Sequence, residues 1–445
     1  MDHHRTPGPA TAGPPTAGPG APGPLTVAPS GHHLVRDGQP LFLLGDTLWA
    51  AFSRMDEAEW VDALRLRRRQ GFNAVQISVL PIAHDRSLGD GARSPFAVRE
   101  NGSWDLDHLD ADYFARARAM VATAHELGLT AVLVVLWCNY VPDTWGSAKT
   151  PELALDDAQT QTYVAQVLAS FADLGPVFCI SGDDSLDSPV ALARYRSALH
   201  QVRDGAPGCL TTVHSNPGAV LPQDWVEDPA LDVFAYQAGH DDGWEERSVA
   251  LPERYAALTP TKPVLSMEPC YEGHGFGGGR ERHDARNVRR ASWSGLLSGA
   301  GAGLGYAAHG AWSWHRVGEE FNGEHFSGIP LPAARALELP GAWDVGLLRR
   351  LVEAHGLYDL RPRQDLVVDD RSGARFSVSP DGRRAVAYLP QAFRLRLGLD
   401  LTGWSVETWD LARGRRDFVA WSRQGEQSVF EQPDTTDDLV HVLWR

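Results

Sequence analysis

Eight short apolar runs recur between residues 42 and 309, and this repeat limits the folds open to the chain more than any other feature. Amphipathic stretches separate most of the runs and predict helices. Buried strands that alternate with helices are typical of an α/β protein with a parallel sheet. Eight repeats over about 300 residues favour a closed (β/α)8 TIM barrel over an open sheet. The predicted strands are FLLGDT (42–47), FNAVQISVL (72–80), TAVLVVLW (130–137), PVFCIS (176–181), CLTTVHS (209–215), LDVFAYQ (231–237), PVLSME (263–268) and GLGYAAH (303–309). The predicted helices cover residues 110–127, 156–174, 189–204, 244–258, 284–299 and 341–358.

An open, doubly wound sheet is the other arrangement for such repeats. It would need a glycine-rich phosphate-binding turn after its first strand. The first run continues as GDTLWAAF (45–52), which is not such a turn. GFGGGR (275–280) has neither the GxGxxG spacing nor the GxxxxGK[ST] pattern, so we interpret it as a flexible lid or turn.

The pattern changes at both ends of the predicted barrel, which gives three regions. Pro, Gly and Ala dominate residues 1–24, a composition that predicts a disordered tail. Residues 25–358 form the predicted catalytic barrel and begin with two β-like runs around the Asp37-Gly38 turn signal. Residues 359–445 contain short alternating runs broken by turn residues, which predict a C-terminal antiparallel β-sandwich without a catalytic group.

Charge and composition narrow the classes of partner. The net charge of −16 argues against a broad nucleic-acid or anionic-membrane surface. No run of 18 apolar residues predicts a membrane span, and residues 1–24 lack the apolar segment of a secretory signal, so we expect a cytoplasmic protein. The four cysteines form no CxxC pair, and we interpret them as buried thiols. Fifteen tryptophans give slight support to a carbohydrate ligand, because indole faces pack against sugar rings.

Polar side chains gather at the ends of the predicted strands. Active-site groups of a parallel barrel lie at the carboxyl ends of its strands, and unpaired polar groups there are costly unless they have a task. We therefore predict one site built from these residues. Its members are Asp46, Trp49, Gln76, Trp137, Asp183, His214, Gln237, His240, Glu268, Tyr271, Glu272, His309 and Trp312.

Two of these residues fit the chemistry of glycoside hydrolysis. That reaction needs a carboxylic acid to protonate the leaving oxygen and a carboxylate to attack or to activate water. The fourth strand ends in SGDD and the seventh in SMEPCYE, which supplies Asp183 and Glu268. Each has another possible role, since Asp183 could cap the following helix and Glu268 could form an ion pair. Asp184 is the candidate for a cap or for a partner of Asp183.

The chain resembles the apiosidase-like glycoside hydrolases, which pair a (β/α)8 barrel with a C-terminal Ig-like β-sandwich. Matching segments run through most of residues 33–435, and the most specific are FAYQAGH (234–240) and KPVLSMEPCYEG (262–273). The resemblance implies Asp183 as acid/base and Glu268 as nucleophile, with no cofactor. Where the family motif usually has two glycines before the Asp, this chain has Ser181 in the first position and a second acid after it. The choice between Asp183 and Asp184 therefore stays open at this point.

The predicted function is that of a retaining exo-glycosidase without a metal, acting on a plant-derived oligosaccharide or glycoside. The resemblance suggests that the terminal sugar is a furanoside such as apiose. We expect Tyr271 and His240 to position the two carboxyl groups, and the other strand-end residues to bind the sugar. Alternative roles are an N-cap for Asp46, a hydrogen bond to Tyr271 for Glu272, and core packing for the three histidines.

Two other functions remain to be weighed. A metal-dependent barrel hydrolase could use the strand-end histidines with Glu268 and Asp46, but the His-x-His expected at the end of the first strand is absent. A non-catalytic carbohydrate-binding protein would be favoured if either Asp183 or Glu268 were missing.

Overall fold

The computed structural model describes residues 23–84, 92–321, 325–368 and 373–445. The predicted tail therefore lies almost wholly outside the described residues. Eight parallel strands form one sheet in the order β10-β9-β8-β5-β4-β15-β12-β11, which follows the order of the chain around a barrel. The backbone N–H of Val233 donates to the Thr211 carbonyl at 3.1 Å and links the two end strands. The strands are β4 (Leu43–Thr47), β5 (Ala74–Ser78), β8 (Thr130–Trp137), β9 (Val177–Gly182), β10 (Thr211–Thr212), β11 (Phe234–Gln237), β12 (Val264–Glu268) and β15 (Gly303–Tyr306).

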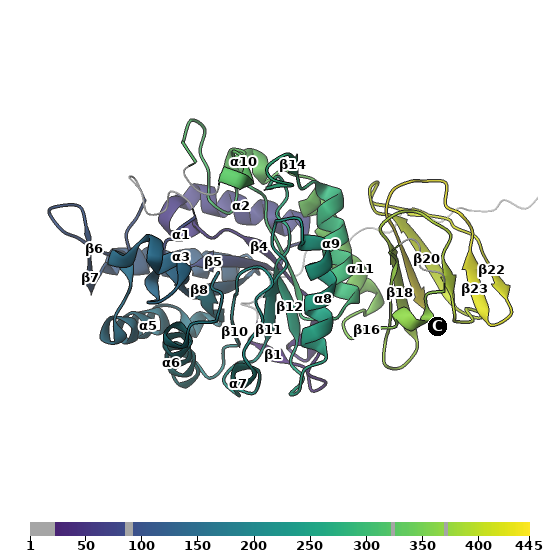
Figure 1. Cartoon of the computed structure of the whole chain (residues 1–445), viewed down its shortest axis with the longest axis horizontal. Helices are drawn as coiled ribbons and strands as arrows, with labels where there is room; N and C mark the ends of the chain where they lie inside the picture. The colour runs from purple at the N-terminus through teal and green to yellow at the C-terminus, as the bar shows by residue number, and fades with distance from the viewer. Residues whose placement is uncertain (1–22, 85–91, 322–324, 369–372) are drawn as a thin grey trace, which may run out of the picture.

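Helices surround this sheet (Figure 1), as the alternating pattern predicts. Local sequence sets their ends. Asp56 and Glu59 form a capping box at the start of α2, and Gly71 ends that helix in the left-handed conformation. The long helices are α2 (Glu57–Gln70), α3 (Ala111–Glu126), α5 (Asp157–Phe171), α6 (Pro189–Gly205), α8 (Trp244–Ala256), α9 (Ala285–Leu297) and α11 (Gly341–His355). None of the helices in the described part of the chain is long and apolar enough to cross a membrane.

Three local features differ from the sequence prediction. The fifth strand, predicted over 209–215, has only Thr211 and Thr212 in regular pairing. A hairpin of β6 (Phe96–Val98) and β7 (Trp104–Leu109) stands between β5 and α3. A short helix, α4 (Trp145–Lys149), follows β8 and brings two side chains to the barrel mouth. Short inserted elements lack the periodicity that a longer helix or strand imposes on a sequence.

The N-terminal strands cover the opposite end of the barrel. β1 (Leu25–Val27), β2 (Leu34–Arg36) and β3 (Gln39–Leu41) form an antiparallel sheet. Asp37 and Gly38 both have positive φ in the β2–β3 turn, as the Asp-Gly signal predicts. Arg36 donates to the Thr130 hydroxyl at the start of β8 at 2.6 Å.

The C-terminal region consists of two antiparallel sheets. One has the order β16-β17-β18-β24-β20-β21 and the other β19-β23-β22. A separate apolar core contains Phe376, Leu389 and Leu443 of the larger sheet and Leu397 and Phe430 of the smaller. The strands are β16 (Arg361–Pro362), β17 (Arg375–Val378), β18 (Arg384–Leu389), β19 (Arg396–Leu397), β20 (Ser405–Asp410), β21 (Arg415–Asp417), β22 (Trp421–Gln424), β23 (Gln427–Phe430) and β24 (Leu439–Trp444).

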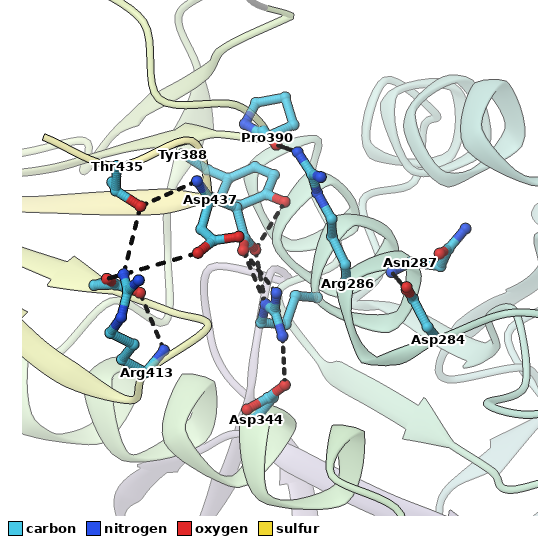
Figure 2. A network of polar contacts seen from close by, with 12 residues as sticks. Asp284, Arg286, Asn287, Asp344, Tyr388, Pro390, Arg413, Thr435 and Asp437 are labelled. Atoms are coloured by element: carbon cyan, nitrogen blue, oxygen red, sulfur yellow. Dashed lines mark hydrogen bonds and ion pairs between the residues drawn. The ribbon is translucent and has the colours of Figure 1, made fainter. Parts of the chain in front are cut away.

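The other face of the larger sheet packs on the barrel helices. Trp293 of α9 stacks on Tyr388 of β18 with ring centroids 6.2 Å apart. Arg289, also on α9, pairs with Asp438 beside β24 and with Asp344 of α11, each at 2.8 Å. Figure 2 shows this network. Both apolar packing and buried ion pairs therefore join the two regions.

Candidate active site

A cavity of about 540 Å³ opens at the carboxyl ends of the barrel strands. Eight of the residues predicted from strand-end positions line it, and both candidate catalytic carboxyl groups are among them. The lining residues are Trp49, Ile82, His84, Trp137, Trp145, Lys149, Asp183, Asn216, Pro217, Gln237, His240, Asp241, Glu268, Tyr271, His274, Trp312 and Phe326.

Glu268 is the last residue of β12, where the pairing with β11 is irregular. Tyr236 pairs with Ser266 but Gln237 pairs with Glu268, so Met267 is an extra residue on β12. A bulge of this kind turns the following side chain relative to a regular strand. It places the Glu268 carboxylate beside the Gln237 amide, which donates to Oε1 at 2.7 Å.

Two imidazoles complete the surroundings of the Glu268 carboxylate. His240 Nε2 lies 3.0 Å from Oε1, and His214 Nε2 lies 3.1 Å from Oε2. Burial alone would raise the pKa of Glu268, but the hydrogen bonds and charge of the two histidines outweigh burial and hold that pKa well below its usual range. Glu268 is therefore ionised across the neutral pH range, as a nucleophile or base must be.

Hydrogen bonds fix the orientation of His240. The backbone N–H of Tyr271 donates to His240 Nδ1 at 3.2 Å. This leaves the proton of a neutral ring on Nε2, where it faces Glu268. The rings of His240 and Tyr271 lie 4.2 Å apart, and the Tyr271 hydroxyl accepts a hydrogen bond from Trp49 Nε1 at 3.1 Å.

Asp183 follows β9 in an uncommon backbone conformation, with φ of +52°. Among residues other than glycine, Asp and Asn adopt this left-handed region most readily, and such residues gather at functional sites. Trp145 Nε1 donates to the Asp183 carbonyl at 2.7 Å. The Oδ2 atom lies 3.1 Å from His84 Nε2, and the Oδ1 atom has no hydrogen-bond partner within the described structure. One oxygen of the carboxyl group thus lies beside His84, and the other is buried without a hydrogen-bond partner among the described residues.

Asp184 is turned away from the cavity. Its backbone pairs with Ser215 and extends the contact between β9 and β10, and its Oδ2 accepts from the Leu186 N–H at 3.3 Å. Burial raises the pKa of Asp184 to about 6. Neither acid caps the next helix, because Ser188 does so. The cap predicted as the alternative role for both residues is therefore absent.

Ser181 connects the two halves of the site. Its hydroxyl donates to the His214 carbonyl at 2.9 Å and accepts from the His214 N–H at 3.2 Å. His214 is fully buried beneath the cavity, where it contacts Glu268. The serine that departs from the resembled motif thus fixes the backbone of a histidine that holds Glu268.

Five of the predicted substrate-binding residues do not line the cavity: Asp46, Gln76, His214, Glu272 and His309. Asp46 is fully buried and forms an ion pair with Arg67 of α2 at 2.7 Å. Its neighbour Thr47 points into the barrel, where its hydroxyl accepts from Gln76 Nε2 at 2.8 Å. Successive side chains of a strand point to opposite faces, so Asp46 points outward to the helices. Its role is structural in place of the predicted sugar contact.

Gln76 fills the barrel interior below the site. It also donates to the Met267 carbonyl at 3.1 Å, and this bond supports the bulge that precedes Glu268. A Cβ atom on Gly305 would lie 2.9 Å from Gln76 Nε2, so the missing side chain makes room for the amide. Inward side chains of such barrels form packed layers, and Gln76 belongs to one of them.

Glu272 neither reaches the cavity nor contacts Tyr271. It accepts from the Tyr306 hydroxyl at 2.7 Å and from the Gly341 N–H at the start of α11 at 2.9 Å. Burial raises its pKa to about 7. His309 is buried between Trp312, which donates to its Nδ1 at 3.2 Å, and the Gly328 carbonyl. Burial lowers the pKa of His309 to about 3, so it is a neutral packing residue.

Several lining residues escaped the sequence prediction. His84 lies six residues beyond the end of β5, Trp145 and Lys149 lie on α4, and Phe326 lies far beyond β15. A rule based on strand ends cannot find residues carried by long loops. The aromatic and imidazole side chains in these loops were the only signal for them. Among the described residues, no group of three or more His, Cys, Asp or Glu side chains is arranged to hold a metal ion.

Comparisons with known proteins agree with this fold. A family model described as "Apiosidase-like, catalytic domain" matches residues 28–359. A glycoside hydrolase family 5 protein from Bacteroides vulgatus has a TM-score of 0.78 at 18% identity, with 95% of this chain and 93% of that chain covered. A second structure, described as a glycoside hydrolase, gives the same TM-score and identity with 95% and 97% covered. An α-amylase from H. orenii has a TM-score of 0.53 at 8% identity, with 91% and 99% covered. At these identities the solved structures show a shared fold alone, and no curated protein matches the chain.

Proposed function

The chain belongs to the apiosidase-like family of glycoside hydrolases, and from this we propose that it is a retaining exo-glycosidase in which Glu268 is the nucleophile and Asp183 the acid/base. The observation that carries the proposal is the contrast between the two carboxyl groups in one cavity. Glu268 is held as an anion by three nitrogen-bearing side chains. Asp183 keeps one oxygen without a partner among the described residues.

This contrast gives the two carboxyl groups different roles in a double-displacement reaction. In the first step Glu268 attacks the anomeric carbon, while Asp183 gives its proton to the leaving oxygen. In the second step Asp183 takes a proton from water as the water displaces Glu268. A retaining enzyme has its two carboxyl groups about 5–5.5 Å apart, and a separation nearer 8 Å would instead leave room for a water in an inverting reaction.

The cavity wall supports a sugar ligand. Trp49 and Trp137 lie with ring centroids 5.3 Å apart, and Trp145 and Trp312 add further apolar faces. Gln237, His240 and Asn216 provide polar groups beside these faces. We propose that the site holds a terminal furanoside such as apiose, released from a plant-derived oligosaccharide or glycoside. The apiosidase-like family gives this choice of sugar.

A panel of 4-nitrophenyl glycosides tests the activity and the sugar. We expect release of nitrophenol from apiofuranosides, none from the Glu268→Gln variant, and full activity after exhaustive chelation. Proton NMR of the first product should show the anomeric configuration of the substrate. A product of opposite configuration would replace the retaining mechanism with an inverting one, and loss of activity on chelation would favour a metal-dependent hydrolase.

Substitutions separate the roles of the two carboxyl groups. In Glu268→Ala, azide should restore turnover and give an inverted glycosyl azide. In Asp183→Ala, a 2,4-dinitrophenyl glycoside should still react, whereas an alkyl glycoside should lose most of the 10²–10⁴-fold that general acid catalysis typically contributes. If Asp184→Ala shows this dependence on the leaving group and Asp183→Ala does not, the acid/base assignment passes to Asp184.

A further inference from the structure

His84 lies beside the proposed acid/base, and the mechanism above does not use it. Its Nε2 lies 3.1 Å from Asp183 Oδ2, and the two side chains are 12% and 13% exposed. Both line the cavity. His84 belongs to the loop that follows β5, while Asp183 follows β9, so only the folded barrel brings them together.

Two tryptophans hold His84 and Asp183 in fixed positions relative to each other. The His84 ring lies 5.8 Å from the Trp137 ring and 5.0 Å from the Trp145 ring, measured between centroids. The same tryptophans contact the backbone around Asp183. Trp137 packs so closely on Gly182 that a Cβ atom there would lie 2.5 Å from the indole, and Trp145 donates to the Asp183 carbonyl. Because the same two tryptophans pack against His84 and against the backbone around Asp183, the contact between these two residues is held more firmly than an ion pair between exposed side chains.

We propose that His84 is a positioning residue for the acid/base, which contacts Asp183 Oδ2 and fixes the carboxyl group at the wall of the cavity. The inference rests on the proposed function of Asp183. With the carboxyl group held in place, its proton moves to the leaving oxygen as the glycosidic bond breaks and the electron pair of that bond passes to the oxygen. Asp183 is then an anion, and an N–H of His84 stabilises it until the carboxylate takes the proton of the attacking water.

Three other charged side chains lie around the pair formed by His84 and Asp183. Lys149 Nζ lies 4.6 Å from the centre of the Trp145 ring, on the helix that packs against His84. Asp184 follows Asp183 but is directed to the Leu186 N–H, and Glu268 is held by its own partners across the cavity.

Two variants of the full-length chain test this. His84→Leu removes the donor, and His84→Gln keeps an N–H without an ionisable ring. With methyl apiofuranoside, His84→Leu should lower kcat/KM by roughly 10- to 100-fold, a part of what general acid catalysis supplies. With 2,4-dinitrophenyl apiofuranoside, which needs little protonation, the loss should stay below about threefold. His84→Gln should recover most of the activity on the methyl glycoside.

The outcomes separate this inference from the proposed function. An equal loss on both substrates, with an unchanged unfolding temperature, would overturn the role of His84. Asp183→Ala, measured beside it, shows whether Asp183 is the acid/base at all. If Asp183→Ala shows the leaving-group dependence and His84→Leu does not, only the inference fails. If neither variant shows it, the proposed function fails first.

Discussion

At the scale of single residues, the surroundings of the Glu268 carboxylate determine its ionisation. Gln237, His240 and His214 all contact it, from β11 and the segments after β10 and β11. Their combined effect holds the pKa of Glu268 well below its usual range despite burial. The proposed nucleophile therefore stays ionised as the pH falls, and Glu268 should not set the acid limb of the rate profile.

Replacement of His240 by Phe should reverse this. The ring would still pack on Tyr271, but the donor to Oε1 would be lost, so the pKa of Glu268 should rise. A hydrogen bond to a charged group is typically worth about 1.5–3 kcal/mol, which corresponds to roughly one to two pH units. We expect kcat/KM to fall and its acid limb to move to higher pH, by no more than that amount because Glu268 does not set this limb in the unchanged protein.

The exposed histidine His108, which pairs with Asp105 far from the cavity, provides the control for this change. His108→Phe should leave the profile where it is. An acid limb that does not move in His240→Phe would show that His240 has no influence on the ionisation of the nucleophile.

At the scale of elements, the packing between the adjacent strands β8 and β9 fixes the position of Asp183, the proposed acid/base. Gly182, the last residue of β9, pairs with Trp137, the last residue of β8. A Cβ atom on Gly182 would lie 2.5 Å from the Trp137 ring and 2.8 Å from Val134. Trp137 is in turn packed against His84 and Trp49, so it cannot shift without disturbing these contacts.

Gly182→Ala should therefore destabilise the protein and disturb catalysis together. Overpacking of a close-packed region typically costs about 1–3 kcal/mol. We expect guanidinium unfolding to show a loss of that size, with a lower kcat/KM at temperatures where the variant remains folded.

Gly208→Ala is the matched control, because a Cβ atom at Gly208 has nothing within 4 Å. It should be close to neutral in both measurements. Equal stability of the two alanine variants would mean that the contact between Trp137 and Gly182 relaxes without cost.

At the scale of the whole molecule, the C-terminal sheets are joined to the barrel through Arg289. Its guanidinium binds both oxygens of Asp438, which has no exposed surface, and also Asp344 of α11. The Tyr388 hydroxyl donates to Asp438 at 3.4 Å (Figure 2). A buried charge that loses its partner is far more costly than an exposed one.

Arg289→Met should leave Asp438 buried without its counter-charge. Breaking a buried pair in this way typically costs about 3–5 kcal/mol. Calorimetry should show a lower unfolding temperature, with the C-terminal region melting before the barrel.

Arg363→Met removes an exposed arginine whose partner is Asp365, and such pairs are typically worth about 0–1 kcal/mol. It should change the unfolding temperature little. A similar small effect from Arg289→Met would show that apolar packing alone joins the two regions.

The sequence by itself determined the barrel, the C-terminal sheets and the two carboxyl groups, Asp183 and Glu268. Apolar periodicity is a local property that each strand and helix carries in its own residues, and the polar ends of those strands follow directly from it. The tertiary structure decided which of those polar residues reach the cavity. Asp46 and Glu272 satisfied the strand-end rule yet turn to the helices.

The physical reason is that the direction of a side chain depends on pairing with neighbouring strands. The extra residue Met267 turns Glu268 toward Gln237, and no pattern within β12 alone reveals it. The positive φ of Asp183 and the approach of His84 to its carboxyl group likewise depend on contacts between segments about 100 residues apart. Residue types and their spacing thus fixed the chemistry available to the chain, whereas long-range packing fixed which atoms can perform it.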